Sequence, residues 1–252
     1  MKDWPYPRWI AHRGAGKLAP ENTLAAFRVG ASHGYRMFEC DAKLSADGVP
    51  FLMHDATLER TTNAREVLDP SQQLVGGEHP WGVLSRLDAG SWHSTAWAGE
   101  PLASLANAAR FCLQNGFCLN IEIKPTPGVE QRTGEVVAEY AGRLWRGAAV
   151  PPVLSSFQRE ALQAARAAAP QLPRGLLLDR LQRGWLDAAL ALECAAIICD
   201  HRLWDGDIVL QVQKAGLRCL SYTVNEQRAA QRLIELGTDG IITDRVDLFP
   251  PA

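Results

Sequence analysis

The sequence predicts a (β/α)8 TIM barrel, and three features of the 252-residue chain lead to that prediction. Short apolar runs alternate with amphipathic segments from one end to the other, as in strands that are covered by helices. Gly34, Gly116, Gly216 and Gly237 each follow a helical pattern and precede an apolar run, where glycine commonly ends a helix. The chain also has the length of a single α/β barrel.

Eight apolar runs are the expected strands, and eight parallel strands close a barrel. Right-handed crossovers through the intervening helices would place the strands side by side in chain order. The runs are residues 9–11, 37–42, 118–123, 153–156, 175–178, 196–199, 218–223 and 240–243. The alternative is an open doubly wound sheet, which is less favoured because no GxGxxG motif follows the first run.

One interval interrupts the alternation of strands and helices. Residues 55–101 contain Trp81, Trp92 and Trp97, several glycines and no long periodicity. We expect residues 1–252 to form one catalytic barrel domain, with residues 55–101 as a small subdomain inserted after the second strand, over the rim that carries barrel active sites. Its tryptophans would form its own core. A tight turn at residues 45–48 would bring residues 49–54 back antiparallel toward that rim.

The composition argues against nucleic-acid and membrane partners. The formal net charge is −2 and no run of lysine and arginine occurs, so there is no strong field to attract a polyanion. No apolar stretch approaches the roughly 20 residues of a membrane span, and the first residues lack the apolar region of a signal peptide. The 6 cysteines are scattered without a CxxC pair. We expect reduced thiols and a cytoplasmic protein.

Three acidic residues interrupt the expected strands. Glu39 and Asp41 share one face of the second strand because strand side chains alternate, and Glu122 lies near the end of the third. A charge inside an apolar strand needs a partner, and an all-oxygen cluster suits Mg²⁺, Ca²⁺ or Mn²⁺ better than zinc. We therefore expect one divalent cation here. The alternative is that these acids are solvated or paired with arginines.

Two basic side chains adjoin the acids. Arg13 ends the first strand and could bind a phosphate bidentately, and Lys124 shares the face of Glu122. The alternatives are a surface role for Arg13 and a salt bridge from Lys124 to the same acids. Three carboxylates, a divalent cation, a phosphodiester and these two cations sum to about zero charge, which a partly buried site tolerates. Metal-assisted phosphoryl chemistry is the favoured interpretation.

Hydrolysis of a phosphodiester also moves protons. His12 and His54 could divide that work, since histidine titrates near neutrality. Glu21 precedes the first expected helix and could approach the rim beside His12, because loops after barrel strands line active sites. The next residues, Asn22 and Thr23, could instead serve only to cap that helix.

At these positions the sequence closely resembles the glycerophosphodiester phosphodiesterase family, similar to its short cytoplasmic bacterial members. Any one matching stretch is weak, but together they span nearly the whole chain in family order. They are residues 11–14 (AHRG), 19–23 (APENT), 38–41 (FECD), 47–48 (DG), 53–55 (MHD), 58–62 (LERTT), 121–124 (IEIK), 222–225 (YTVN) and 239–244 (DGIITD).

The resemblance implies hydrolysis of glycerophosphocholine, glycerophosphoethanolamine and similar diesters to sn-glycerol 3-phosphate and an alcohol. It implies a cyclic phosphate intermediate, formed when the glycerol hydroxyl of the substrate attacks phosphorus. By position it assigns roles to the residues already singled out: Mg²⁺ or Ca²⁺ ligands Glu39, Asp41 and Glu122, acid/base histidines His12 and His54, and phosphate-binding Arg13 and Lys124. Tyr222 stands where the family commonly has a tryptophan that is associated with the glycerol.

Two other functions stay open at this point. A phospholipase D or lyase-type phosphodiesterase acting on lysophospholipids would use similar residues, but it would need an apolar surface to contact a membrane. A non-catalytic phosphate-binding barrel would be signalled by the loss of a metal ligand or a histidine, and none of these residues is missing. The expected partner is therefore a small-molecule glycerophosphodiester.

Overall fold

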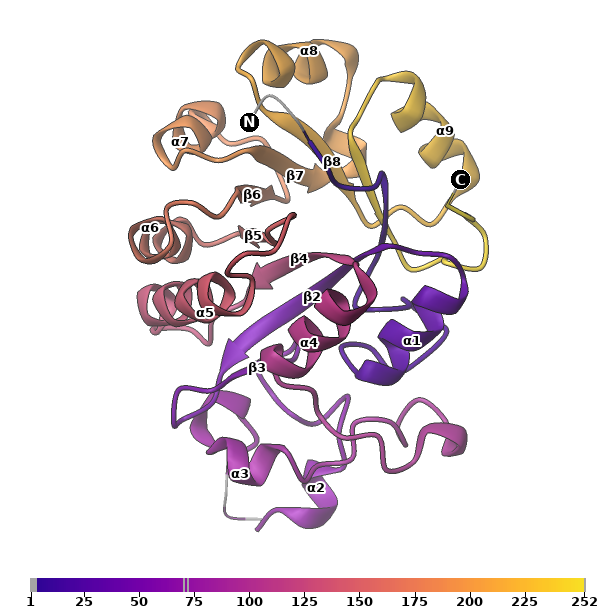
Figure 1. The fold of residues 1–252 in the computed structure, drawn as a ribbon, viewed down its shortest axis with the longest axis vertical. Coiled ribbons are helices and arrows are strands. Elements are labelled where there is room, and N and C mark those ends of the chain that lie inside the picture. The colour runs from indigo at the N-terminus through magenta and orange to yellow at the C-terminus, as the bar shows by residue number, and fades with distance from the viewer. Residues whose placement is uncertain (1–3, 70, 72, 252) are drawn as a thin grey trace.

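The computed structural model describes residues 4–69, 71 and 73–251, and it has the closed barrel that the sequence predicts (Figure 1). β1 pairs with both β9 and β2, so the parallel sheet closes on itself. Its strands are β1 (Trp9–Ala11), β2 (Met37–Leu44), β4 (Cys118–Ile123), β5 (Val153–Ser156), β6 (Arg174–Leu178), β7 (Ala196–Asp200), β8 (Arg218–Tyr222) and β9 (Gly240–Thr243). Each overlaps a predicted run, with ends that differ by no more than two residues.

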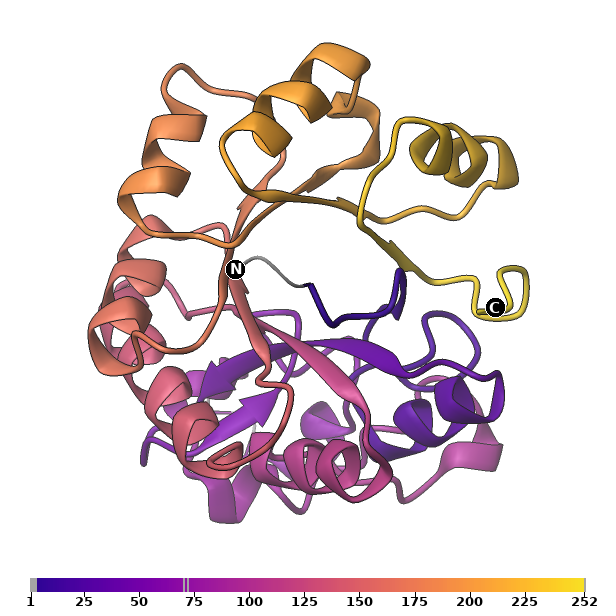
Figure 2. The same ribbon diagram turned by 45° about the horizontal axis from the view of Figure 1, so that its top comes forward.

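Helices cover the outside of the barrel (Figure 2). Between successive parallel strands lie α1 (Leu24–Ser32), α4 (Leu105–Asn115), α5 (Glu130–Leu144), α6 (Arg159–Ala168), α7 (Trp185–Ala191), α8 (Gly206–Lys214) and α9 (Gln227–Glu235). Gly34, Gly116, Gly216 and Gly237 have φ values between 66° and 88°, which confirms them as helix-ending positions. In the described part of the chain, no helix combines the length and the apolar character that crossing a membrane requires.

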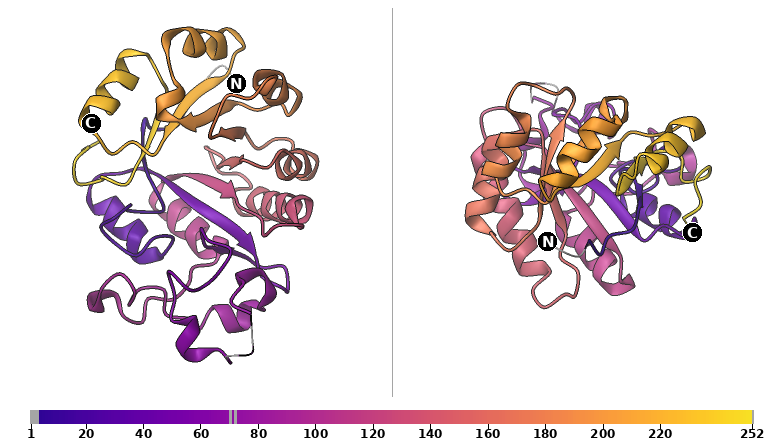
Figure 3. Two further views of the ribbon diagram at one scale, coloured as in Figure 1. Left: turned by 180° about the vertical axis from the view of Figure 1, so that it is seen from behind. Right: turned by 90° about the horizontal axis from the view of Figure 1, so that it is seen from above.

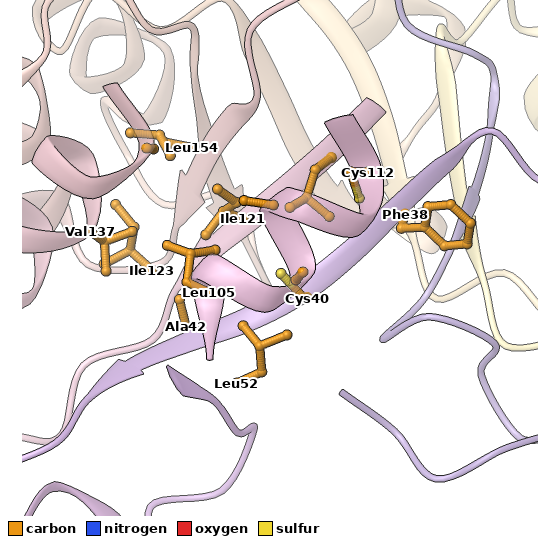
Figure 4. Packing of buried hydrophobic residues seen from close by; sticks show 14 of the residues in the cluster. Phe38, Cys40, Ala42, Leu52, Leu105, Cys112, Ile121, Ile123, Val137 and Leu154 are labelled. Atoms are coloured by element: carbon orange, nitrogen blue, oxygen red, sulfur yellow. The ribbon is translucent and has the colours of Figure 1, made fainter. Parts of the chain in front are cut away.

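The main core lies between the strands and the helices (Figure 4). Cys40 and Ala42 of β2 pack there with Ile121 of β4 and Leu105 of α4, all of them fully buried. Because side chains alternate along a strand, this outward packing leaves the residues between them facing the barrel interior. The outward position of Cys40 also turns its thiol away from the neighbouring acids Glu39 and Asp41, since successive side chains of a strand point to opposite faces.

The interior of the barrel is apolar at the amino-terminal ends of the strands. Ile10, Ile198 and Leu220 meet there, and Tyr6 from the N-terminal segment packs beneath them. The Tyr6 hydroxyl donates a hydrogen bond to the carbonyl oxygen of Pro151 over 2.9 Å. Polar inward-facing side chains therefore lie toward the carboxyl ends of the strands, where barrel enzymes place their sites.

After β2 the chain turns back as β3 (Pro50–Leu52), which pairs antiparallel with β2. The following segment forms only short helices, at the end of the molecule opposite α8 (Figures 1 and 3). They are α2 (Ala64–Val67), η1 (Gly76–Glu78), α3 (Trp81–Leu84) and η2 (Thr95–Trp97). Phe51 of β3 packs with Leu58 and Leu84 of this segment in an apolar cluster that is separate from the main core. The division of the chain into one domain with an insertion at residues 55–101 stays a prediction.

The expectation that the tryptophans of this segment form its core is wrong for two of the three. Trp81 packs against the local cluster. Trp97 packs against the main core instead, and Trp92 is 38% exposed. Trp97 therefore contacts the rest of the protein, whereas the Trp92 indole N–H donates to the carbonyl oxygen of Ala89 within the segment itself.

Helices α5 and α6 approach each other closely at Gly134. A Cβ atom at this position would lie 2.1 Å from the carbonyl oxygen of Ala161. We expect Gly134→Ala to lower the free energy of unfolding by about 1–3 kcal/mol, because the two helices must move apart.

Gly142→Ala is the matched control in the same helix. Its Cβ would lie 3.3 Å from the flexible end of Gln171 and at an ordinary contact distance, 3.7 Å, from Ala169 Cβ. Helix propensity should then raise the free energy of unfolding by up to about 1 kcal/mol. Urea unfolding of both variants measures the difference, and equal stabilities would contradict the close approach at Gly134.

Candidate active site

The loop from β1 to α1 is bent sharply at the carboxyl end of the barrel. Arg13 and Asn22 have positive φ values of 49° and 60°, which are uncommon for residues other than glycine. Gly16 lies so close to β9 that a Cβ there would be 2.2 Å from the backbone of Asp244. This bend directs the Arg13 N–H toward β2, where it donates to Glu39 Oε2 over 3.0 Å. Strained backbone of this kind is characteristic of functional sites.

The three acids predicted to bind a cation come together. One carboxylate oxygen from each of Glu39, Asp41 and Glu122 lies within 4.8 Å of the others. A Ca²⁺ ion with oxygen ligands at about 2.3–2.6 Å can contact ligands at that separation. Glu39 Oε1 and Asp41 Oδ1 are buried without a hydrogen-bond partner, a costly state that a cation would relieve. The donor set therefore fits a divalent cation.

Basic side chains pair with these acids on two sides. Arg13 Nε lies 3.2 Å from Asp41 Oδ2, and Arg13 Nη1 donates to Glu21 Oε1 over 2.9 Å. Lys124 Nζ donates to Glu122 Oε1 over 2.9 Å and lies 3.5 Å from Asp41 Oδ1. The salt bridge considered as an alternative for Lys124 is thus present, and the side chain still lines the cavity.

Burial and mutual repulsion strongly perturb the acids. Burial and the charge of Asp41 raise the pKa of Glu39 to about 8. Burial and Asp41 also raise the pKa of Glu122. Burial would raise the pKa of Asp41 as well, but the charges of Arg13 and Lys124 outweigh it and lower the pKa to about 2. Without a cation, the site therefore favours an uncharged Glu39.

The two candidate acid/base histidines are held in the same way. His12 Nδ1 lies 2.6 Å from Asp244 Oδ1, and His54 Nδ1 lies 2.7 Å from Asp55 Oδ1. A carboxylate accepts a hydrogen bond from Nδ1–H, so we assign the proton of each neutral ring to Nδ1. Nε2 of each ring then carries no proton and can exchange one with a substrate, and His12 Nε2 lies 3.7 Å from Glu39 Oε2.

The two histidines differ in their electrostatic surroundings. Burial lowers the pKa of His12, but the hydrogen bond to Asp244 and the charge of Glu39 outweigh it, so the pKa is raised overall. Burial lowers the pKa of His54, and the favourable charge of Asp41 does not compensate. Opposite shifts of this kind suit a pair in which one ring donates a proton and the other accepts one.

Asp244 and Asn225 have no role in the sequence interpretation, although both lie in matching stretches. Asn225 Nδ2 donates to Asp244 Oδ2, and the Asp244 N–H donates to Asn225 Oδ1, each over 2.9 Å. Burial would raise the pKa of Asp244, but the hydrogen bonds with His12 and Asn225 and the charges of His12 and Arg13 together outweigh it and lower the pKa to about 2. Their signal in the sequence is a polar side chain shortly after β8 or β9.

A cavity of about 240 Å³ opens over these groups. Seven of the nine predicted site residues line it: His12, Arg13, Glu39, His54, Glu122, Lys124 and Tyr222. Asp41 lies beneath the cavity at 1% exposure, and Glu21 lies outside this lining as the partner of Arg13.

Aromatic side chains form one wall of the cavity. Tyr222 and Phe157 have ring centroids 5.8 Å apart with their planes nearly perpendicular. The Tyr222 hydroxyl donates to the carbonyl oxygen of Leu178 over 2.9 Å, so that donor is already used within the protein. Phe157 follows β5 as an isolated aromatic residue, and nothing in the sequence pattern distinguishes it.

The sequence also matches a known family. The model of the glycerophosphoryl diester phosphodiesterase family aligns with residues 12–248. The chain belongs to this family. A glycerophosphodiester phosphodiesterase of Caldanaerobacter subterraneus subsp. tengcongensis is 31% identical to this family member over 240 residues, which cover 93% of each chain. The predicted enzyme class, a glycerophosphodiester phosphodiesterase, is therefore confirmed.

Solved structures agree with this family assignment. A phosphodiesterase of Oleispira antarctica, solved with the product sn-glycerol-3-phosphate, superimposes with a TM-score of 0.85 and 31% identity. The alignment covers 95% of this chain and 93% of that one. A glycerophosphodiester phosphodiesterase of Agrobacterium tumefaciens gives a TM-score of 0.80 at 27% identity, over 98% and 100% of the two chains. The predicted barrel fold is thus confirmed.

The raised pKa of Glu39 makes stability depend on pH when no metal is present. Between about pH 4.5 and 8, the folded protein holds a proton that the unfolded chain releases. The free energy of unfolding should therefore fall as pH rises through this range in EDTA. Urea unfolding at several pH values measures this slope.

Glu39→Gln is the matched variant for this measurement, since it keeps the shape of the side chain without a titrating proton. We expect it to show a shallower fall of the free energy of unfolding than the wild type. The raised pKa of His12 gives a slope of the same sign, and the variant keeps the part of it that the hydrogen bond to Asp244 causes. Identical slopes would show that Glu39 is not protonated in the folded metal-free protein.

Proposed function

We propose that this family member hydrolyses glycerophosphodiesters, such as glycerophosphocholine and glycerophosphoethanolamine, to sn-glycerol 3-phosphate and an alcohol. One cation, Mg²⁺ or Ca²⁺ or alternatively Mn²⁺, would be held by Glu39, Asp41 and Glu122. The observation that carries the proposal is that one buried oxygen of Glu39 and one of Asp41 accept no hydrogen bond, beside a cavity that two aspartate-held histidines also line.

The basic side chains support binding of the phosphodiester group. Arg13 and Lys124 both line the cavity. They follow β1 and β4, the strands on the two sides of β2, and so they flank its acids from both sides. Each can offer N–H donors to a non-bridging phosphate oxygen while remaining close to its carboxylate partner. When bound, the cation would supply Lewis-acid polarisation of the phosphate and neutralise developing charge.

His12 and His54 would then handle the protons of the reaction. In the first step, the Nε2 of a neutral ring accepts the proton of the attacking glycerol hydroxyl, and a protonated ring gives one to the departing alcohol. The product of this step is a cyclic phosphate. In the second step a water molecule opens the ring and the two transfers run in reverse, so both histidines return to their starting states.

The aromatic wall bears on how the substrate is held. Because the Tyr222 hydroxyl is used by Leu178, the surface that Tyr222 offers to the cavity is its ring. Together with Phe157 this gives the cavity an apolar side, suited to the carbon skeleton of glycerol. We infer that Tyr222 replaces a larger aromatic ring without adding a hydrogen bond to the substrate.

An activity assay tests the proposal directly. We expect the purified protein with Mg²⁺ or Ca²⁺ to release sn-glycerol 3-phosphate from at least one member of a headgroup panel, and EDTA to abolish release. A coupled glycerol-3-phosphate dehydrogenase assay measures it. The panel should include lysophosphatidylcholine, assayed by choline release because its other product keeps the acyl chain, and activity on that substrate alone would support the phospholipase alternative. No release from any compound with metal present would overturn the enzymatic proposal.

The histidine roles have their own test. His12→Ala and His54→Ala should each lower kcat by about 10²-fold or more, since each removes one partner of the proton transfers. His33→Ala, outside the cavity lining, is the control and should retain wild-type turnover. Circular dichroism verifies that all three variants are folded. Normal turnover in either cavity variant would remove that histidine from its proposed role.

A further inference from the structure

Arg60 makes an unusually complete set of contacts for a surface residue. It lies in the LERTT stretch of residues 58–62, to which the mechanism above gives no part. Its Nε and Nη2 donate to the two oxygens of Asp55 over 2.6 and 3.1 Å. Its Nη1 and Nη2 donate to the two oxygens of Glu21, both over 2.8 Å. One guanidinium thus binds two carboxylates, each through both oxygens.

Both carboxylates lead directly to residues of the candidate site. Asp55 holds Nδ1 of His54, and Glu21 accepts a hydrogen bond from Nη1 of Arg13. These two partners come from different parts of the chain, one after β3 and the other after β1. Arg60 therefore connects the carboxylate that holds the candidate acid/base group His54 to the carboxylate that binds the phosphate-binding group Arg13.

We propose that Arg60 is a positioning residue that holds His54 and Arg13 in their relative placement through Asp55 and Glu21. The inference rests on the proposed function, which gives those two side chains their roles. It also gives the segment after β3 a task in catalysis, because Arg60 belongs to that segment.

The chemistry of this contact requires arginine. A planar guanidinium can bind two carboxylates side by side, whereas a lysine ammonium is a single point charge on a flexible stem. The ring of Trp92 covers the guanidinium, with its centroid 5.9 Å from Arg60 Cζ. Nε2 of the next residue, His93, lies 3.0 Å from the carbonyl oxygen of Lys17. This contact attaches the Trp92 region to the β1–α1 loop.

Arg60 is not what fastens the segment to the barrel. The carboxylate of Glu100 accepts a hydrogen bond from the backbone N–H of Ala25 at the start of α1, and β3 remains paired with β2. The Arg60 side chain is also 43% exposed, so its ion pairs are screened and contribute little to stability. Removing its guanidinium should therefore change the placement of His54 and Arg13 more than the fold.

Kinetics of Arg60 variants test this. We expect Arg60→Met to lower kcat/KM by about 10²-fold, through both kcat and KM, since misplacement by about 1 Å can have that effect. Arg60→Lys should recover part of the loss and carries the test if Arg60→Met fails to fold. Arg65→Ala removes an exposed arginine that pairs with Glu59 in the same segment, and it should stay within about twofold of the wild type.

Double-mutant cycles separate a positioning role from a general structural one. If Arg60 acts on His54 through Asp55, then Arg60→Met should no longer lower kcat in an Asp55→Ala background. If it acts on Arg13 through Glu21, it should no longer raise KM in a Glu21→Ala background. Residues that act through a shared partner are non-additive in this way. Multiplicative effects in both backgrounds would overturn the inference.

A spectroscopic measurement keeps the inference independent of turnover. Long-range ¹H–¹⁵N spectra of the histidine rings, with His54 assigned from the signal lost in His54→Ala, report which ring nitrogen carries the proton. We expect the Nδ1–H form in the wild type and a larger share of the Nε2–H form in Arg60→Met. An unchanged tautomer would contradict the proposed positioning of His54 through Asp55. Inactivity of the wild-type protein would instead refute the proposed function and leave this readout intact.

Discussion

Two carboxylates buried on one strand are the constraint on which the rest of the site depends. Glu39 and Asp41 are 3% and 1% exposed, and ionised groups so far from water need compensation from every side. The compensation comes from separate elements: the bent loop after β1 brings Arg13, β4 brings Lys124, and the same inward face of β2 adds buried Lys43, which donates to the carbonyl oxygen of Lys124. The carboxylate oxygens that still accept no hydrogen bond, Glu39 Oε1 and Asp41 Oδ1, are the ones that a cation would satisfy.

Much of this arrangement follows from local sequence patterns, and the part that does not is long-range. The strands could be predicted because their apolar runs are short and recur in order, and the convergence of Glu39, Asp41 and Glu122 follows from alternation on parallel neighbours. The contact of Asp244 with His12 depends on closure of the barrel, which joins residues 232 positions apart. The bridge from Arg60 to Glu21 crosses 39 positions between two loops that have no periodicity to place them.

The tryptophans of residues 55–101 also show what sequence patterns alone cannot predict. Composition predicts that a tryptophan-rich segment buries its own rings, yet burial depends on how much apolar surface a segment can enclose. Here Trp97 packs into the main core and Trp92 covers the guanidinium of Arg60. Trp97 looks like a local core residue in the sequence but contacts the main core, and only the folded arrangement distinguishes the two uses.

The closing edge of the sheet has a consequence for the whole molecule. β1 meets β2 through Ala11 and Phe38, whereas β2 meets β4 along six residue pairs. The β1–β2 pairing that closes the barrel therefore has few backbone hydrogen bonds, and side-chain hydrogen bonds beside it add to the contact. The Arg13 N–H binds Glu39, and Asn22 exchanges two hydrogen bonds with Asp41. The polar groups that would bind metal and phosphate thus also help to hold β1 and its following loop against β2. Losing them would weaken the closure of the barrel as well as remove the binding groups of the site.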